Sequence, residues 1–244
     1  MMSDKYNDTA ETPADIYIRR SRVEHALGEA VRNPLVYVIA GVGCGKTRAV
    51  EAFLKTRNEW RVDWLQLSDN DNTGAWYWEH VTHVIAQHDP KLAARLREMG
   101  FPDTDVKLKR FCTGMTAYRQ EAGGMLCIVL DDFHHLTERQ VLDFHERFIN
   151  AMIPHTRIIV ISRKEPNINI MPVLSKDKVS VIGEEVLRFT QEEIAEFLTY
   201  QSVPFSYKRL PEIHSQTQGW ALAVRLLEMS LKRIPDDEPL ASRR

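Results

Sequence analysis

The chain has 244 residues, of which 43% are hydrophobic and 9% are aromatic, and its formal net charge at pH 7 is −2. This composition supplies a packed core and excludes a disordered chain, and the charge balance excludes the strongly basic footprint of a free-standing nucleic-acid binder. The 3 cysteines form no close pair and no apolar run approaches the ~20 residues that span a bilayer, so we expect a cytoplasmic protein without disulfides, zinc or membrane contact.

The first predicted elements surround a glycine-rich turn. A flexible lead-in over residues 1–15 precedes a helical pattern at 19–33, which an Asn-Pro pair ends. The apolar run LVYVIA at 35–40 is typical of a strand that is buried on both faces, and the spacing of apolar residues predicts a helix over 47–57. WRVDWLQL at 60–67 alternates enough to form a second strand, and the turn-rich stretch SDNDNTG follows it.

Further strands alternate with helices through the middle of the chain. Helical spacing recurs in three stretches, at residues 77–85, 91–100 and 108–118. The almost unbroken apolar run MLCIVLDD at 125–132 predicts a third buried strand that ends in two aspartates. A helix at 141–152 and strands at 157–163 and 178–183 complete this part. Strands that alternate with helices favour an α/β fold with a parallel five-stranded sheet covered on both faces.

The pattern changes near residue 188, because only helices are predicted beyond it. Thr190 and Glu193 have the spacing of a capping box at the start of TQEEIAEFLTYQ, and two further helical patterns follow. We therefore expect an α/β domain at 16–188, a small helical lid domain at 189–232, and a linker or frayed end at 233–244.

The segment AGVGCGKT joins the first strand to the next helix and predicts a phosphate-binding loop. Its glycines let the backbone bend and approach an anion, while the N–H groups of the turn and the helix N-terminus suit a β-phosphate. Lys46 would reach the β- and γ-phosphates, and the Thr47 hydroxyl would bind Mg²⁺. Ala40 stands where the usual motif has glycine, which is a mild loss because alanine is small. The other residues expected to line the nucleotide here are Gly41, Val42, Gly43, Cys44, Gly45 and Arg48.

Two other strand ends carry side chains suited to the same site. Asp131 would hold Mg²⁺ directly or through water together with Thr47, and Asp132 lies where a water-activating carboxylate is often found. Asp132 and Lys46 are therefore the expected catalytic residues, although aspartate has a shorter reach than glutamate and efficient water activation is not expected. Arg163 follows the fourth strand, at the edge that lines the ligand crevice of an open sheet, and would bind the γ-phosphate; a surface arginine is the alternative.

In this order, these segments resemble the nucleotide-binding module of the MalT-like, LuxR-type transcriptional regulators, which belong to the STAND class of signal-transduction P-loop NTPases. The resemblance covers about residues 16–231 and rests on RRSRVEHAL, AGVGCGKT, WLQLSDNDN, IVLDDFHHL, IVISRKEP, LRFTQEEIAEFL and QTQGWALAVRLL. The phosphate loop and the paired aspartates are individually unspecific, whereas SDNDN, SR and GWALA make the combination fairly specific.

The resemblance implies an AAA-like ATPase core, with an extra strand between the phosphate-loop strand and the Mg-binding strand, followed by a helical lid. It also implies an ADP-bound resting state and an ATP-bound active state that self-associates. By the same resemblance, Arg19 lies near the adenine and ribose, and Trp220 falls where related ATPases carry a Gly-x-Pro motif that touches the base. Here Ala221 replaces the proline, so core packing is the alternative for Trp220. Full members bind DNA through C-terminal segments that this chain does not contain.

The sequence thus favours an ATP-binding regulatory switch that uses ATP or ADP with Mg²⁺ and hydrolyses ATP slowly. The alternative is a true enzyme, either a P-loop kinase or a motor-type ATPase. A kinase would need an acceptor site and usually an arginine-rich lid segment, which is not recognisable between the strands. A scaffold that binds no nucleotide is disfavoured by the intact Lys46, Thr47 and Asp131.

Several other polar and aromatic groups are expected to be structural. Because adjacent histidines cannot both face one site, we expect His134 and His135 to face solvent or to form local hydrogen bonds, and the same for His145, rather than to bind a metal. The aromatic triplet at 76–78 is expected to anchor the core, and Cys44 to be a small filler residue.

Overall fold

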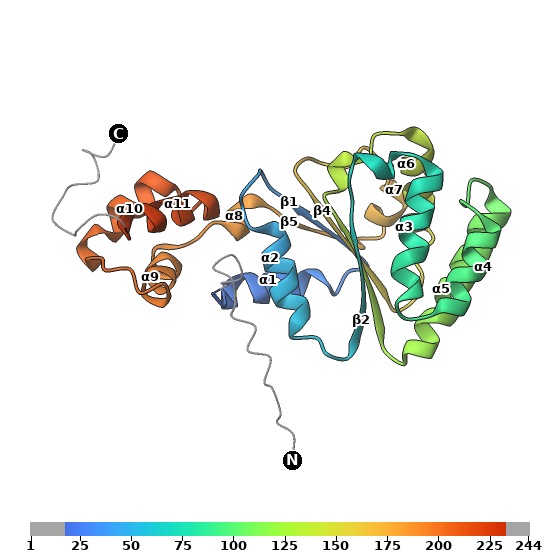
Figure 1. The fold of residues 1–244 in the computed structure, drawn as a ribbon, viewed down its shortest axis with the longest axis horizontal. Helices are drawn as coiled ribbons and strands as arrows, with labels where there is room; N and C mark the ends of the chain where they lie inside the picture. The colour runs from blue at the N-terminus through green and yellow to red at the C-terminus, as the bar shows by residue number, and fades with distance from the viewer. Residues whose placement is uncertain (1–17, 233–244) are drawn as a thin grey trace, which may run out of the picture.

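The computed structural model describes residues 18–232, so the lead-in predicted at 1–15 and the linker predicted at 233–244 lie outside the described residues. At its centre is an all-parallel sheet of 5 strands in the order β2-β3-β4-β1-β5 (Figure 1). The strands are β1 Leu35–Ile39, β2 Trp60–Gln66, β3 Met125–Asp131, β4 Thr156–Ser162 and β5 Val179–Ile182. The predicted α/β fold is confirmed, and so is the extra strand, because β4 lies between β1 and β3.

Helices cover both faces of this sheet. The helices are α1 Ser21–Ala30, α2 Lys46–Lys55, α3 Gly74–Ala86, α4 Pro90–Met99, α5 Asp105–Ala122, α6 Arg139–Asn150, α7 Met171–Leu174, α8 Glu184–Leu187, α9 Gln191–Tyr200, α10 Leu210–Thr217 and α11 Ala221–Leu231, with the short 3-10 turns η1 Asp69–Asn72, η2 Phe133–His135 and η3 Tyr207–Arg209. Helices α1 and α2 lie on one face and α3 to α7 on the other (Figure 1). Within the described range, no helix combines the length and apolar character that crossing a membrane requires.

The alternation of side chains along β1 explains why its whole run is apolar. Val36 and Val38 pack in the cluster that includes α1 and α2, whereas Leu35 and Tyr37 pack in the cluster on the opposite face. Successive side chains of a strand point to opposite faces, so a strand with helices on both sides needs apolar residues at every position. This is the physical reason that a short unbroken apolar run predicted a buried parallel strand.

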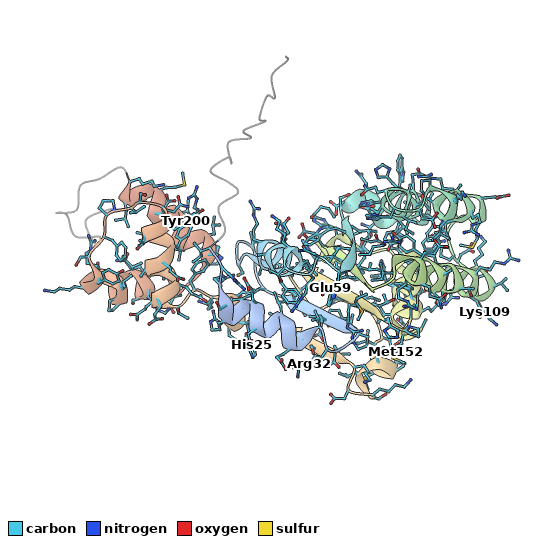
Figure 2. All side chains as sticks on the ribbon, turned by 90° about the horizontal axis from the view of Figure 1, so that it is seen from below. His25, Arg32, Glu59, Lys109, Met152 and Tyr200 are labelled. Carbon is cyan, nitrogen blue, oxygen red and sulfur yellow. The ribbon has the colours of Figure 1, made fainter. Side chains whose placement is uncertain are left out.

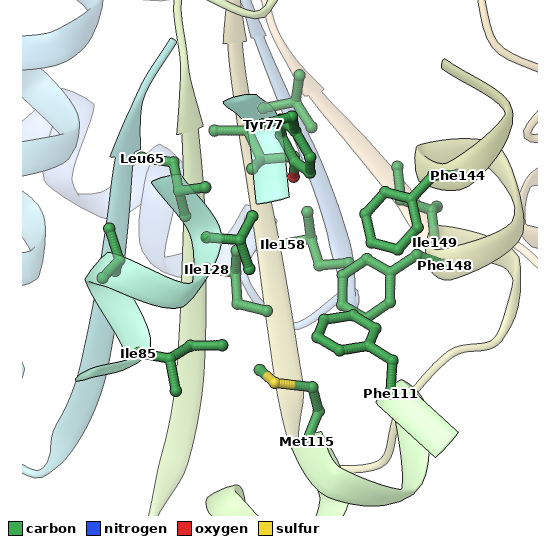
Figure 3. Close-up of a cluster of buried hydrophobic side chains, with 14 of the residues drawn as sticks. Leu65, Tyr77, Ile85, Phe111, Met115, Ile128, Phe144, Phe148, Ile149 and Ile158 are labelled. Carbon is green, nitrogen blue, oxygen red and sulfur yellow. The ribbon is translucent and has the colours of Figure 1, made fainter. Parts of the chain in front are cut away.

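The larger cluster is rich in aromatic residues. Phenylalanines of α5 and α6 face isoleucines of β3 and β4 (Figure 3). Tyr77 and Trp78 are buried in this cluster, as predicted, while Trp76 is 67% exposed and does not contribute to it. The larger part of the core therefore lies under α3, α5 and α6, while the second cluster, under α1 and α2, includes Ala40 and Cys44 of the loop that follows β1.

The C-terminal helices α9 to α11 form a hydrophobic cluster of their own, to which Ile18 also belongs. They gather at one end of the molecule, and Figure 2 places Tyr200 of α9 and Lys109 of α5 at opposite ends. The predicted capping box is confirmed, because the Thr190 hydroxyl accepts from the Glu193 amide (3.2 Å) and the Glu193 carboxylate accepts from the Thr190 amide (3.1 Å). A domain boundary at residue 188 stays a prediction.

Candidate nucleotide-binding site

The register of the sheet brings the ends of four strands to one edge. Ile39, which ends β1, pairs with Ser162, which ends β4; Gln66, which ends β2, pairs with Asp131, which ends β3. Because the strands are parallel, these ends form the carboxyl edge of the sheet, where open α/β proteins bind ligands. The candidate loop, the second aspartate and the candidate arginine directly follow these strand ends.

The loop between β1 and α2 bends at two glycines. Gly43 has a φ of 71° and Gly45 a φ of 78°, both in the left-handed region that favours glycine. Ala40 has no positive φ and is 4% exposed, so the alanine at the first motif position adds no backbone strain. Cys44 is buried, and burial raises the pKa of its thiol, which agrees with the predicted role of a filler residue.

The ammonium group of Lys46 lies inside this bend. The side chain is buried, and Nζ donates to the carbonyl oxygens of Ala40 and Gly41, both at 2.9 Å. Burial lowers the pKa of Lys46, while the nearby carboxylates of Asp131 and Asp132 oppose that shift. An ammonium group has three hydrogens, so one remains to reach an anion when the other two hold the loop.

Thr47 and Asp131 connect the loop to β3. The Thr47 hydroxyl donates to Asp131 Oδ1 (3.2 Å), and the Asp132 amide donates to the same oxygen (2.9 Å). Asp131 is fully buried, and within residues 18–232 its Oδ2 has no hydrogen-bond partner. Burial raises the pKa of this carboxyl. A buried carboxylate oxygen without a partner, beside a hydroxyl, fits the ligands that Mg²⁺ prefers, so these residues fit the metal expected from the sequence.

Asp132 and Arg163 lie beside this pair. Asp132 has a φ of 55°, which is uncommon for a residue with a side chain and is typical of functional turns. Gln66 Nε2 donates to Asp132 Oδ2 (2.8 Å), which fixes the carboxylate at the edge of the sheet. Arg163 is exposed and directly follows β4 at this edge of the sheet.

The histidines depart from the prediction in two of three cases. His135 Nδ1 donates a local hydrogen bond to Asp69 Oδ1 (2.7 Å), as expected. His134 does not face solvent, because both of its ring nitrogens are buried. Neither nitrogen has a hydrogen-bond partner among the described residues, although Nδ1 lies 3.7 Å from Asp132 Oδ1. His145 is also buried, and desolvation lowers its pKa to about 3, so it stays neutral in the aromatic core. Between residues 18 and 232, no three or more His, Cys, Asp or Glu side chains gather in a way that could hold a metal ion.

His134 is a site residue that the sequence interpretation missed. Residue spacing could not show that the short turn η2 brings the rings of His134 and His135 to 4.4 Å between centroids and places His134 beside Asp132. Its position directly after the paired aspartates was the only signal in the sequence that could have identified it.

Arg19 and Arg48 each form an ion pair with a nearby glutamate. Arg19 is exposed and forms an ion pair with Glu24 (3.0 Å), with no hydrogen bond to the phosphate loop among the described residues. Arg48, in the first turn of α2, pairs with Glu51 (3.4 Å). The structure therefore brings the loop, Asp131 and Asp132 together, whereas the position of Arg19 near the adenine and ribose stays a prediction.

The start of α11 packs directly on the phosphate loop. Trp220 Nε1 donates to the carbonyl oxygen of Val42 (2.9 Å), and the Leu222 amide donates to the carbonyl oxygen of Gly43 (3.0 Å). A Cβ atom at Gly43 would lie 2.7 Å from Leu222 Cβ. Trp220 is 37% exposed, so the alternative of simple core packing is wrong.

Gly43→Ala is therefore expected to destabilise the protein by about 1–3 kcal/mol, because the new methyl group meets both a positive φ and a close neighbour. Gly41→Ala is the matched control, since Gly41 has no positive φ and a Cβ there would lie 3.7 Å from its nearest neighbour. Urea unfolding monitored by circular dichroism measures both variants. Equal free energies of unfolding for the two variants would contradict the close contact between the loop and α11.

Comparison with solved structures agrees with the fold. A Signal Transduction ATPase with Numerous Domains from Pyrococcus horikoshii, which carries a tetratricopeptide repeat sensor, aligns with a TM-score of 0.63 at 12% identity over 93% of this chain and 31% of that chain. A Walker-type ATPase of Pyrococcus abyssi aligns with a TM-score of 0.60 at 12% identity over 91% of this chain and 69% of that chain. This chain has the P-loop ATPase fold. At such low identity, the likeness extends to the fold alone.

The amino-acid sequence was also compared with family models and with curated proteins. No family model matches the chain. The serine/threonine-protein kinase PknK of Mycobacterium tuberculosis and that of Mycobacterium bovis are each 25% identical over 227 residues, which is 90% of this chain. This chain spans 20% of the length of those relatives, so the activity of the whole kinase does not transfer to it.

Proposed function

We propose that the chain binds ATP and ADP with Mg²⁺ at the carboxyl edge of its sheet and acts as a regulatory switch module in the cytoplasm. The observation that carries the proposal is the meeting of Lys46, Thr47 and Asp131 around one bend. The ammonium group has a hydrogen to spare, the hydroxyl touches the carboxylate, and the second carboxylate oxygen is buried without a partner in residues 18–232. A phosphate chain with its metal would satisfy all three.

The roles of the residues follow from their positions. The loop from Gly41 to Thr47 would hold the phosphates through its amides, and Lys46 would contact the β- and γ-phosphates. Thr47 and Asp131 would hold Mg²⁺, which when bound offsets the charge of the phosphate oxygens. Arg163 follows β4 at the same edge of the sheet and would contact the γ-phosphate, the group that distinguishes ATP from ADP.

Slow hydrolysis is the activity that this arrangement supports. Asp132 is held by Gln66 and lies near His134, so together they would orient an attacking water. The short Asp132 side chain and its fixed carboxylate favour slow turnover, which suits a switch whose ATP state must persist. We further propose the finer assignment to MalT-like STAND regulators, in which the ATP state self-associates and segments outside these 244 residues contact DNA.

Two measurements together test this proposal: the rate of ATP hydrolysis and the difference in conformation between the ADP and ATP states. A single-turnover assay with Mg-ATP is expected to give a rate below about 10⁻² s⁻¹, the range of switch NTPases that have no trans-acting arginine. Hydrogen exchange is expected to differ between the Mg-ADP and Mg-ATPγS complexes. A rate of about 1–100 s⁻¹, as in kinases, with identical exchange in both complexes would instead support the alternative of a true enzyme.

A further inference from the structure

We infer that Trp220 and the backbone amide of Leu222 position the phosphate loop from outside, so that the helical segment sets how strongly the loop holds phosphate. This inference rests on the proposed nucleotide binding and deepens it. It differs from the expected contact between Trp220 and the nucleotide base, since it uses the bond between the indole nitrogen and the loop itself.

The contact consists of two adjacent hydrogen bonds between segments far apart in the chain. The indole of Trp220 donates to Val42 O at 2.9 Å, across 178 positions, and the next carbonyl, that of Gly43, accepts from the Leu222 amide at 3.0 Å. The backbone of Gly43 approaches so closely that an added Cβ would lie 3.2 Å from the indole nitrogen. Two consecutive carbonyl groups of the loop are thus held by one helix start.

These two bonds fix the direction of the loop amides. In a trans peptide the C=O and the following N–H point in opposite directions, and residues 18–232 contain no cis peptide bond. The amides of Gly43 and Cys44 therefore point away from α11. Neither amide has a hydrogen-bond acceptor within the described residues. Both are thus held in a fixed direction and are available to an anion, which is what preorganised phosphate binding requires.

The coupling works in both directions. If the start of α11 raises the affinity of the loop for phosphate, bound phosphate must stabilise the start of α11 on the loop by the same factor. The indole N–H is the donor that links the two, since tryptophan has a donor and no acceptor. Phosphate bound to the loop would thereby stabilise the start of α11 through two hydrogen bonds. This effect would need no contact between the nucleotide base and Trp220.

Trp220→Phe tests the inference, because it keeps an aromatic ring and removes the indole donor. We expect Mg-ATP and Mg-tripolyphosphate to bind about three- to tenfold more weakly, by the same factor, as one hydrogen bond predicts. Trp76→Phe is the control, since Trp76 is 67% exposed and lies outside the core. Isothermal titration calorimetry gives both dissociation constants. Weaker binding of ATP with unchanged binding of tripolyphosphate would mean a base contact, and unchanged binding of both would mean no role; either result overturns the inference.

A second measurement uses only the wild-type chain, so it tests the inference even if the variant folds poorly. In the wild-type chain, Mg-tripolyphosphate is expected to slow hydrogen exchange at the Leu222 amide and the Trp220 indole, measured by NMR. No change at either position in a saturated sample would overturn the inference. If the wild-type chain binds neither ATP nor tripolyphosphate, the proposed function fails instead, so the two failures are distinguishable.

Discussion

Lys46→Ala is expected to abolish the stabilisation of the chain by Mg-ATP. For the wild type, a ligand at 100 times its dissociation constant adds about 2.7 kcal/mol to the free energy of unfolding. For a chain of this size, that raises the melting temperature by about 5–10 °C. The variant loses the only ammonium group that the structure places inside the bend, among the described residues, and should show a shift near zero. Differential scanning fluorimetry with and without Mg-ATP measures this difference directly.

Lys55→Ala is the matched control for that experiment. Lys55 lies on the same helix α2, at its C-terminal end, and is exposed. The control should retain the full shift, because it removes the same charge from the chain without touching the loop. The comparison uses the shift for each variant, so a change in the stability of the nucleotide-free protein does not affect it. Equal shifts for both variants would show that nucleotide binds elsewhere or not at all.

Asp131→Asn is expected to have opposite effects on the nucleotide-free and the Mg-bound protein. Burial raises the pKa of Asp131 in the folded state, so the folded protein binds more protons than the unfolded chain between the two pKa values. The free energy of unfolding therefore falls as pH rises through that window, and at pH 7 the ionised carboxylate still costs stability. The variant removes this cost, and the nucleotide-free protein should become more stable at pH 7.

In the same variant, the factor by which Mg²⁺ strengthens nucleotide binding should fall by at least about tenfold, because a neutral amide replaces the charged ligand. Calorimetric titrations of ADP with Mg²⁺ and with EDTA measure this dependence. Asp177→Asn provides the control, since Asp177 is exposed, and asparagine tolerates its φ of 56°. An Asp131 variant that is destabilised without nucleotide, and that keeps its response to Mg²⁺, would contradict the assigned role.

The central strands β1, β3 and β4 were predictable because each is buried on both faces. Runs such as LVYVIA and MLCIVL are apolar at every position, which is typical of strands in a sheet with helices on both sides. The candidate loop was predictable for a different reason, since the order of strand, glycine-rich turn, Lys46 and helix occurs within one continuous segment. Local chemistry alone was sufficient for these parts of the site.

The contact between Trp220 and the loop could not be predicted, because it joins residues 178 positions apart and depends on the placement of α11. The resemblance to known families identified the position of Trp220 but suggested a different contact. His134 was missed for a related reason: the left-handed backbone at Asp132 redirects the chain into η2, and no sequence pattern specifies that turn. Residue spacing thus could not predict either the packing of α11 on the loop or the unusual φ angle at Asp132.

The most direct test of nucleotide binding is a calorimetric titration of the nucleotide-free wild-type chain with Mg-ADP, repeated with Mg-tripolyphosphate. We predict saturable binding of both ligands at a single shared site, with tripolyphosphate displaced by ADP and neither ligand bound by Lys46→Ala. The absence of binding heat for both ligands, in a folded sample at millimolar ligand concentration, would contradict the assignment of this bend as a phosphate site.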